Sequence, residues 1–417
     1  MFWEESDEKD YCIFVLVIAA SCIDPYTPNL KNYTSLLAVE GLITNENSSY
    51  KIKLSRTFSQ ASSIPENVTD ANVYITDGDG IKTDLQNCNT GFYKTDSTSF
   101  SGVPGQKYTL HILTSDGKEY KSDECTLLPV AGIDQLHYVK GDEISGTQGE
   151  LLTGLKILLN SSDATGMDQY FRWTFEEVWK FRIPYPQQYT YAVVNDTTID
   201  FEPVPVIESV CWKKNQSGNI ITNSILPDGT NYINNQEIQF IVPAKLDRLT
   251  EEYSILVKQY SVSQEEFDFW NNLKKAGETG GDIFALQPFT VISNIHNLNN
   301  TNEMGLGYFE VSSVIQKRIF ITTHELDPLD LPFYKTDCFQ IAKSPADFNG
   351  NMTWDAIYHM YMSLGYTFVA PEVPPGIILS NHVLEKDLLK LDFATKVCSI
   401  CEQTGFSTKP DFWIDLK

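Results

Sequence analysis

The stretch Asp168-Gln-Tyr-Phe-Arg-Trp-Thr-Phe-Glu-Glu-Val-Trp-Lys-Phe-Arg182 has the clearest structural pattern in the chain. Large apolar residues recur at every second position, which is the period of a β-strand with one buried face. We expect a sheet core here, and the alternative is a surface platform that stacks against carbohydrate. The residues on this face are Phe171, Trp173, Phe175, Glu177, Trp179 and Phe181. Glu177 interrupts the stripe, and a carboxylate on an apolar face needs a partner or a cavity.

Upstream of this stretch, residues 35–130 predict a β-sandwich domain of the immunoglobulin or fibronectin type. Short alternating or β-branched runs are separated by turn residues, as is typical of such sandwiches. Asp116-Gly117 between two of these runs is a strong hairpin signal. The runs are Leu37–Ile43, Tyr50–Arg56, Ala71–Thr76, Gly91–Lys94, Lys107–Thr114 and Glu119–Ser122.

Residues 131–417 predict a larger β-rich domain with two helical insertions. Ser263-Gln-Glu-Glu266 is a capping box, and apolar residues follow at helical spacing, so we expect a helix near 264–276. A second helix is expected near 354–364, where Gly365 provides a stop. We therefore expect a mainly β protein.

Length and charge narrow the functional classes. The 417 residues exceed one typical core, and 42% hydrophobic residues provide enough material for packed cores. The formal net charge is −24. Such an acidic chain does not favour nucleic acid, which is bound through basic patches. It also does not favour electrostatic adhesion to anionic lipid.

The N-terminal stretch Ile13-Phe-Val-Leu-Val-Ile-Ala-Ala-Ser-Cys22 predicts a lipoprotein signal peptide. An apolar run this short cannot span a bilayer, which takes roughly 20 residues, and it ends in a small-residue cleavage site. We expect residues 1–21 to be removed, Cys22 to carry lipid, and residues 22–34 to form a tether. The residues before the run are acidic, whereas a signal peptide usually begins with positive charge.

The remaining cysteines are expected to form disulfides, because an even number in an exported chain favours pairing. These are Cys88, Cys125, Cys211, Cys338, Cys398 and Cys401. The spacing does not determine which cysteines pair. Cys398-Ser-Ile-Cys401 also has the C-x-x-C spacing of a zinc half-site or a redox pair, and both remain alternatives.

Other short motifs are weaker. Asp77-Gly-Asp79-Gly-Ile-Lys-Thr-Asp84 could hold calcium, but it lacks the downstream glutamate of an EF-hand, so a hairpin turn is preferred. Ser97 and Thr197 lie in short motifs that resemble bacterial O-glycosylation sites. Glu176 and Glu177 are neighbours on a strand, so their side chains point to opposite faces. We expect no catalytic residue, no metal site and no cofactor.

The order of several motifs resembles the Bacteroidota lipoprotein family named domain of unknown function 4249. The resemblance implies an outer-membrane lipoprotein, facing the cell exterior, that is encoded beside TonB-dependent receptors and has no assigned enzymatic activity. The motifs are Ala19–Cys22, Leu37–Ile43, Tyr50–Arg56, Arg172–Trp179, Cys211–Lys214, Tyr253–Ser261, Phe284–Pro288, Gly307–Phe309, Lys317–Ile319 and Cys398–Trp413.

Together these features predict a non-catalytic outer-membrane lipoprotein that serves as an accessory binding subunit of a TonB-dependent transporter. The expected partners are the membrane, through the lipid anchor, and the transporter. A structural or adhesive lipoprotein of the cell envelope is the first alternative. An exported hydrolase with an unrecognised site is the second, and it would require a cleft with clustered carboxylates or a metal.

Overall fold

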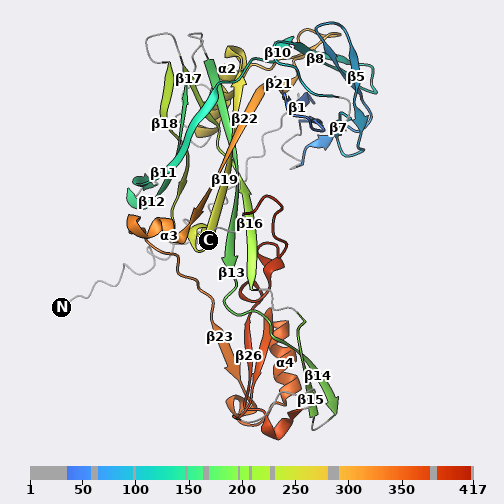
Figure 1. Ribbon diagram of the computed structural model, residues 1–417. Helices are drawn as coiled ribbons and strands as arrows, with labels where there is room; N and C mark the ends of the chain where they lie inside the picture. The colour runs from blue at the N-terminus through green and yellow to red at the C-terminus, as the bar shows by residue number, and fades with distance from the viewer. Residues whose placement is uncertain are drawn as a thin grey trace, which may run out of the picture.

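The aromatic stretch forms β13 (Gln169–Arg182), a long strand inside a five-stranded sheet (Figure 1). The structure is a computed structural model, and it describes residues 35–57, 64–96, 100–145, 149–162, 169–195, 198–205, 209–225, 231–279, 291–375 and 383–414. The fold is mainly β, as expected. Three bodies follow one another along an elongated molecule, and each has its own apolar core.

The first body is a sandwich of two sheets whose inner faces share one core. One sheet has the order β21-β1-β2-β7-β6 with β3 beside β2, and the other has the order β20-β9-β8-β4-β5 with β10 beside β8. Most of the strands are β1 (Leu37–Ile43), β2 (Lys51–Arg56), β3 (Glu66–Asn67), β4 (Asn72–Asp77), β5 (Lys82–Asp84), β6 (Gln86–Asn87), β7 (Phe92–Lys94), β8 (Lys107–Leu113), β9 (Glu119–Ser122) and β10 (Cys125–Thr126).

The two remaining strands of the sandwich come from much later in the chain. They are β20 (Ile295–Asn297), which pairs with β9, and β21 (Leu306–Val311), which pairs in parallel with β1. The expected sandwich of residues 35–130 is therefore incomplete without them. Gly307 on β21 has φ +85°, and an added Cβ would lie 1.9 Å from the carbonyl oxygen of Val39. Only glycine allows the parallel strands to approach in this way.

The central body consists of two sheets packed over a second core. One sheet is β11-β12-β18, and the other is β16-β13-β19-β22 with β17 also beside β13. The alternating face of β13 is buried in this core, so the predicted sheet core is correct. The further strands are β11 (Gly132–Ser145), β12 (Glu150–Ser162), β16 (Val210–Gln216), β17 (Ile221–Ile225), β18 (Tyr232–Ile241), β19 (Glu252–Val262) and β22 (Ser313–Thr322).

Short helices flank the central sheets. The longest is α2 (Gln264–Thr279), which begins where the capping box predicts it, and Ser263 Oγ accepts a hydrogen bond from the Glu266 amide at 3.2 Å. The others are η1 (Asp247–Leu249), α3 (Thr323–Leu326) and η2 (Asp327–Leu329). No helix in the described part of the chain is long and apolar enough to cross a membrane.

A buried polar cluster joins the sandwich to the central body. Arg172 on β13 pairs with Glu310 on β21, and its guanidinium lies 4.6 Å from the ring centroid of Trp270 on α2. Ser312 Oγ donates to the carboxylate of Glu266 at 3.2 Å. Burial, followed by the charge of Glu310, raises the pKa of Glu266 well above its usual range. A raised pKa favours the neutral form of Glu266, which limits charge repulsion in the cluster.

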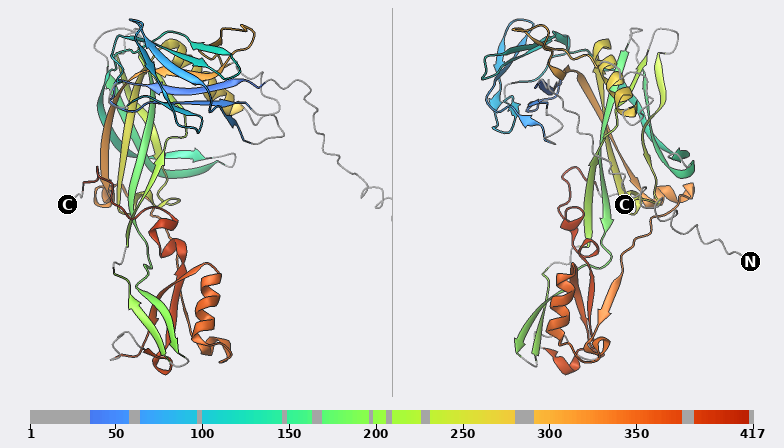
Figure 2. Two further views of the ribbon diagram at one scale, coloured as in Figure 1. Left: turned by 90° about the vertical axis from the view of Figure 1, so that its right-hand side faces the viewer. Right: turned by 180° about the vertical axis from the view of Figure 1, so that it is seen from behind.

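The third body, at the far end of the molecule, was not expected from the sequence. Residues 131–417 contain two cores, because the chain leaves the central sheets to build a small body around Phe201, Ile357, Phe368 and Phe393 (Figure 2). Its sheets are β14-β15-β25 and β23-β26-β24. The elements are β14 (Tyr189–Asn195), β15 (Thr198–Pro203), β23 (Gln340–Lys343), η3 (Pro345–Phe348), α4 (Trp354–Ser363), β24 (Tyr366–Glu372), β25 (Val383–Leu384), η4 (Glu385–Asp387) and β26 (Lys390–Thr395).

The chain then returns to the central body through η5 (Lys396–Cys398) and η6 (Cys401–Gln403). Phe406 forms an isolated β-bridge with Trp212 on β16. Trp413 packs edge-on against Trp212, and its indole Nε1 donates to Glu252 at 3.0 Å. The C-terminal segment therefore covers part of the outer face of the central sheet. The two helices near 264–276 and 354–364 lie where the sequence predicts them.

Candidate functional site

Glu177, the residue that interrupts the apolar stripe, is completely buried in the central core. Its cross-strand neighbour on β16 is Asn215, whose side-chain nitrogen donates to Oε2 at 2.8 Å. The hydroxyl of Tyr253 donates to Oε1 at 2.6 Å, and Arg248 Nη2 lies 3.3 Å from Oε2. The sequence indicated that a carboxylate on this apolar face needs a partner. A counter-charge and several hydrogen-bond donors provide it.

The surroundings of two of these partners, Tyr253 and Arg248, differ in character. Burial, followed by the charge of Glu177, raises the pKa of Tyr253 well above its usual range, so the hydroxyl remains a donor. Arg248 lies on η1, and its guanidinium stands 5.4 Å from the ring centroid of Trp179. Its Nε is buried without a hydrogen-bonding partner among the described residues.

A groove opens beside this cluster, where the two central sheets meet without a backbone ladder. The edge strand β18 faces β17, and among the described residues only side chains bridge them, as Asn223 Nδ2 donates to Gln236 Oε1 at 2.9 Å. The groove has a volume of about 760 Å³. It is lined by Gly218–Thr222, Gln236–Phe240, Glu143, Leu273, Lys274, Gly277 and Glu278.

Gln239 connects the groove to the buried carboxylate. It lies in the groove wall, and its side-chain nitrogen donates to Glu177 Oε1 at 3.3 Å. The other wall is the loop between β16 and β17, and this segment separates from β13 around Gly218. A molecule in the groove would therefore contact a side chain that is already oriented by Glu177.

At one end of the groove, two carboxyl groups share a lysine. Lys156 Nζ on β12 lies 2.8 Å from Glu237 and 3.2 Å from Glu143. Burial, followed by the hydrogen bond to Glu237, raises the pKa of Glu143. Burial of Glu237 opposes its ionisation, but hydrogen bonds from Lys156 and Glu143 outweigh this effect and lower its pKa. The hydrogen bond to Glu237 in turn raises the pKa of Lys156.

The lining determines which ligand chemistry suits the groove. Amides and carboxyl groups supply many hydrogen-bonding positions, and isoleucines together with Phe240 supply apolar surface. The lining holds three acidic residues, Glu143, Glu237 and Glu278, and one basic residue, Lys274, and Lys156 beside the first two offsets part of the negative charge. Coulomb repulsion therefore disfavours anions and favours neutral or cationic polar molecules. Among the described residues, no group of three or more histidine, cysteine or acidic side chains could hold a metal ion.

The cysteines expected in disulfides do not all pair. Two disulfides form, Cys211–Cys401 and Cys338–Cys398, whereas Cys88 and Cys125 are free thiols. The expectation is therefore wrong for Cys88 and Cys125. These two cysteines lie on the sandwich, and neither is bonded to another cysteine of the described residues. The C-x-x-C cysteines each bond to a distant partner, which corrects both the zinc and the redox-pair alternatives for that motif.

The other predicted positions are resolved as follows. Asp77 Oδ1 accepts from the amides of Asp79 and Ile81 at 3.0 and 2.8 Å, so the acidic loop is a hairpin turn between β4 and β5. Glu176 points to the face opposite Glu177 and pairs with Lys258 at 2.9 Å. The positions Cys22, Ser97 and Thr197 lie outside the described residues.

The sequence indicated Glu177 but none of its surroundings. Its partners and the groove residues come from β11, β16, β17, β18, β19, α2, η1 and the loop before β17, and no local motif connects them. The sole available signal was the carboxylate within the apolar stripe, which required a partner somewhere in the chain.

Comparison with known proteins provides the family and little else. No curated protein matches the chain. One solved structure, described as "Biofilm associated protein - BSP domain", is 8% identical with a TM-score of 0.10, and the match covers 72% of this chain. It covers 61% of that structure's chain, and a TM-score this low supports no conclusion. A family model matches residues 23–318, well over half of the sequence. The chain therefore belongs to the family described as Domain of unknown function (DUF4249).

Proposed function

We propose that this protein is a lipid-anchored binding protein of the outer membrane, facing the cell exterior, and that it serves as an accessory subunit of a TonB-dependent transporter. The observation that carries the binding role is the groove between β17 and β18. Its volume of about 760 Å³ is within the range of small-molecule sites. Its ligand is a neutral or cationic polar molecule, because the lining is acidic and rich in amides.

Two features support export. Disulfides form and persist in oxidising compartments outside the cytoplasm, and Cys211–Cys401 and Cys338–Cys398 are both formed. The N-terminal apolar run ending at Cys22 supports a lipid anchor. The transporter as a partner is inferred from the family resemblance.

The groove has one feature that an exported hydrolase would require, because Glu143 and Glu237 both lie in its wall. Acid–base cleavage by two carboxyl groups requires the substrate bond to lie between them. Lys156 Nζ occupies that position, since it binds both carboxyl groups. This arrangement favours a structural ion cluster at the end of a binding groove.

The anchor is tested by replacing Cys22 with Ala and separating membrane and soluble fractions. The variant should move to the soluble fraction, whereas a matched Cys88→Ala variant should stay with the membrane. A Cys22→Ala protein that remains membrane-bound without any partner would show that the anchor assignment is wrong.

The partner is tested by purifying the full chain from detergent-extracted membranes. A β-barrel transporter recovered in stoichiometric amount supports the accessory role. Recovery of the chain without such a partner would instead favour the structural or adhesive alternative.

The groove is tested by native mass spectrometry of the same preparation. Thr222→Trp fills the groove wall, and Thr190→Trp places the same side chain on the exposed β14 as a control. We expect a small-molecule adduct on the wild type and the control but not on Thr222→Trp. An adduct that persists in Thr222→Trp, or no adduct on any form, would count against binding in the groove.

A further inference from the structure

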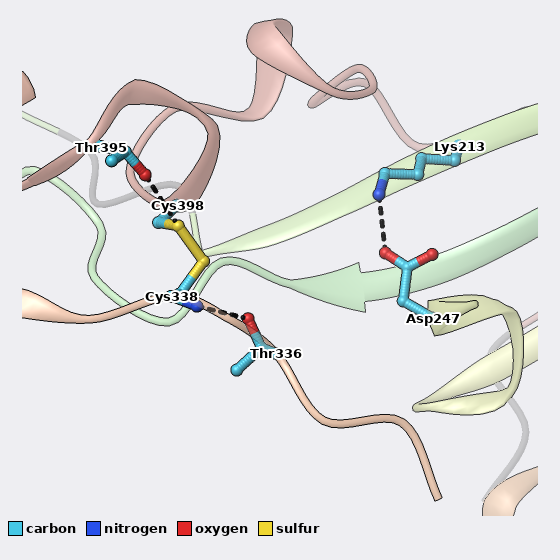
Figure 3. The surroundings of a disulfide bond; sticks show 6 residues. All are labelled: Lys213, Asp247, Thr336, Cys338, Thr395 and Cys398. Carbon is cyan, nitrogen blue, oxygen red and sulfur yellow. Dashed lines mark hydrogen bonds and ion pairs between the residues drawn. A yellow bond between two sulfur atoms is a disulfide. The ribbon is translucent and has the colours of Figure 1, made fainter. Parts of the chain in front are cut away.

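The two disulfides together form a double staple at the neck, the narrow region between the central and the third body. Cys401 is tied to Cys211 on the central strand β16. Cys398, three residues earlier, is tied to Cys338 on the connector, which we define as residues 330–339 between η2 and β23. The C-x-x-C motif thus fixes one cysteine to the central body and the other to the connector. Figure 3 shows the second of these bonds and its surroundings.

The two disulfides differ in their access to solvent. Cys211, Cys401 and Cys398 are exposed by 0%, 2% and 3%, respectively. Cys338 is partly exposed, and it lines a cleft of about 330 Å³ at the neck. The cleft also includes Phe181, Lys213, Tyr334, Thr336 and Val397. The Cys338–Cys398 disulfide therefore borders a solvent-accessible cleft at Cys338, whereas both cysteines of Cys211–Cys401 are buried.

The surroundings of Cys338–Cys398 also suit attack from the cleft. The Thr395 hydroxyl donates a hydrogen bond to Cys398 Sγ at 3.0 Å (Figure 3). When a thiolate attacks Cys338, Cys398 is the leaving sulfur, and this hydrogen bond stabilises its negative charge. Thr336 Oγ1 accepts from the Cys338 amide at 3.1 Å and holds the backbone of the attacked residue. Cys401 Sγ instead faces the Val210 carbonyl oxygen at 3.7 Å.

We propose that Cys338–Cys398 is a reducible lock on the neck, opened by a dithiol reductant that enters the cleft. One thiolate of the reductant bonds to the sulfur of Cys338, and the Cys338–Cys398 bond breaks to leave the Cys398 thiolate, which takes up a proton. The second thiol of the reductant then displaces Cys338 as a thiol. The reductant ends as a cyclic or protein disulfide, and two cysteine thiols form in this chain.

Opening the lock frees the connector without detaching the third body. Segments 183–188 and 396–400 still link the two bodies, and Cys211–Cys401 still secures the second of them. The Tyr185 amide also remains bonded to the Cys398 carbonyl at 3.1 Å. The connector is exposed at Phe333 and Lys335, so loss of its covalent attachment leaves it accessible to proteases.

The order of reduction is tested on the folded, full chain with dithiothreitol as the dithiol. The reaction is stopped at intervals with iodoacetamide, and the labelled cysteines are identified by peptide mass spectrometry. Cys338 and Cys398 should be labelled at least about tenfold faster than Cys211 and Cys401, because exposed disulfides exchange faster than enclosed ones. Cys88 should be labelled without reductant and serves as the internal control. Reduction of all four together, or of Cys211–Cys401 first, would overturn the proposal.

The mechanical consequence is tested by limited digestion with trypsin. Cleavage after Lys335 should increase when the wild type is reduced, and it should already be high without reductant in the double variant Cys338→Ser, Cys398→Ser. Cys88→Ser should behave as the oxidised wild type. If cleavage after Lys335 is unchanged in both the reduced wild type and the double variant, the bond does not hold the connector and the proposal fails.

Discussion

Replacing Arg248 with Met should strongly destabilise the central body. The methionine retains an apolar stem beside Trp179 but removes the positive charge 3.3 Å from Glu177. At that distance a charge pair is worth about 5 kcal/mol with an effective dielectric constant of about 20. Hydrogen bonds from Tyr253, Asn215 and Gln239 remain, so we expect a loss of about 3–5 kcal/mol, as for other buried pairs that lose one partner.

The assay is urea unfolding of the purified chain at neutral pH, followed by tryptophan fluorescence, since Trp173, Trp179 and Trp212 lie in the central body. Lys258→Met is the matched control, because it breaks the pair with Glu176 on the solvent-facing side of the same strand. That pair is partly exposed, and its loss should cost about 1 kcal/mol or less. The double variant Glu177→Gln, Arg248→Met should lose less than the sum of the two single variants. If Arg248→Met costs no more than Lys258→Met, the buried ion pair does not support the core as argued.

Three further outcomes are expected. Burial, followed by the charge of Lys121, lowers the pKa of His111, so the stability that neutral His111 contributes is lost as the pH falls below the unfolded value of 6.5. His111→Phe should therefore reduce the change in unfolding temperature between about pH 7.5 and about pH 5.5. An unchanged dependence of the unfolding temperature on pH would contradict this. The raised pKa of Glu266 means that stability is lost as the pH rises, so Glu266→Gln should unfold at a higher temperature than the wild type at about pH 8.5, with little difference at about pH 4.5. Gly307→Ala should lower the free energy of unfolding of the sandwich by more than about 1 kcal/mol in urea titration, because its Cβ meets Val39; a neutral result would show that the parallel strands can move apart.

Local pattern was sufficient for many of the elements. The alternation from Phe171 to Phe181 predicted β13 and its buried face, because a strand exposes alternate side chains to the core. The hairpin at Asp116-Gly117 and the helix after Ser263 were predicted from turn and capping chemistry, which depends on a few neighbouring residues. The same alternation placed Glu177 on the buried face of β13 and so predicted that it needs polar partners.

Long-range pairing was not available from such patterns. β21 pairs in parallel with β1, although more than half of the chain separates the two strands in the sequence. Nothing in the run Leu306–Val311 indicates β1 as the partner strand. The third body combines β14 and β15 with elements after residue 340, so its core cannot be recognised as one stretch. The disulfide pairs were equally undetermined, since the C-x-x-C spacing of Cys398 and Cys401 suggested a zinc half-site or a redox pair, whereas each cysteine bonds to a distant partner.

The sequence alone determined a mainly β chain, the face of β13 that is buried, and a carboxylate in the core that had to be satisfied. Only the tertiary structure decided what satisfies it: Asn215 from the next strand, Tyr253 from the strand on the other side, Arg248 from η1, and Gln239 from the opposing sheet. Periodicity reports how each segment meets the core, because burial is a local property of alternating side chains. It does not report which segments meet one another, because that depends on contacts between residues far apart in the chain.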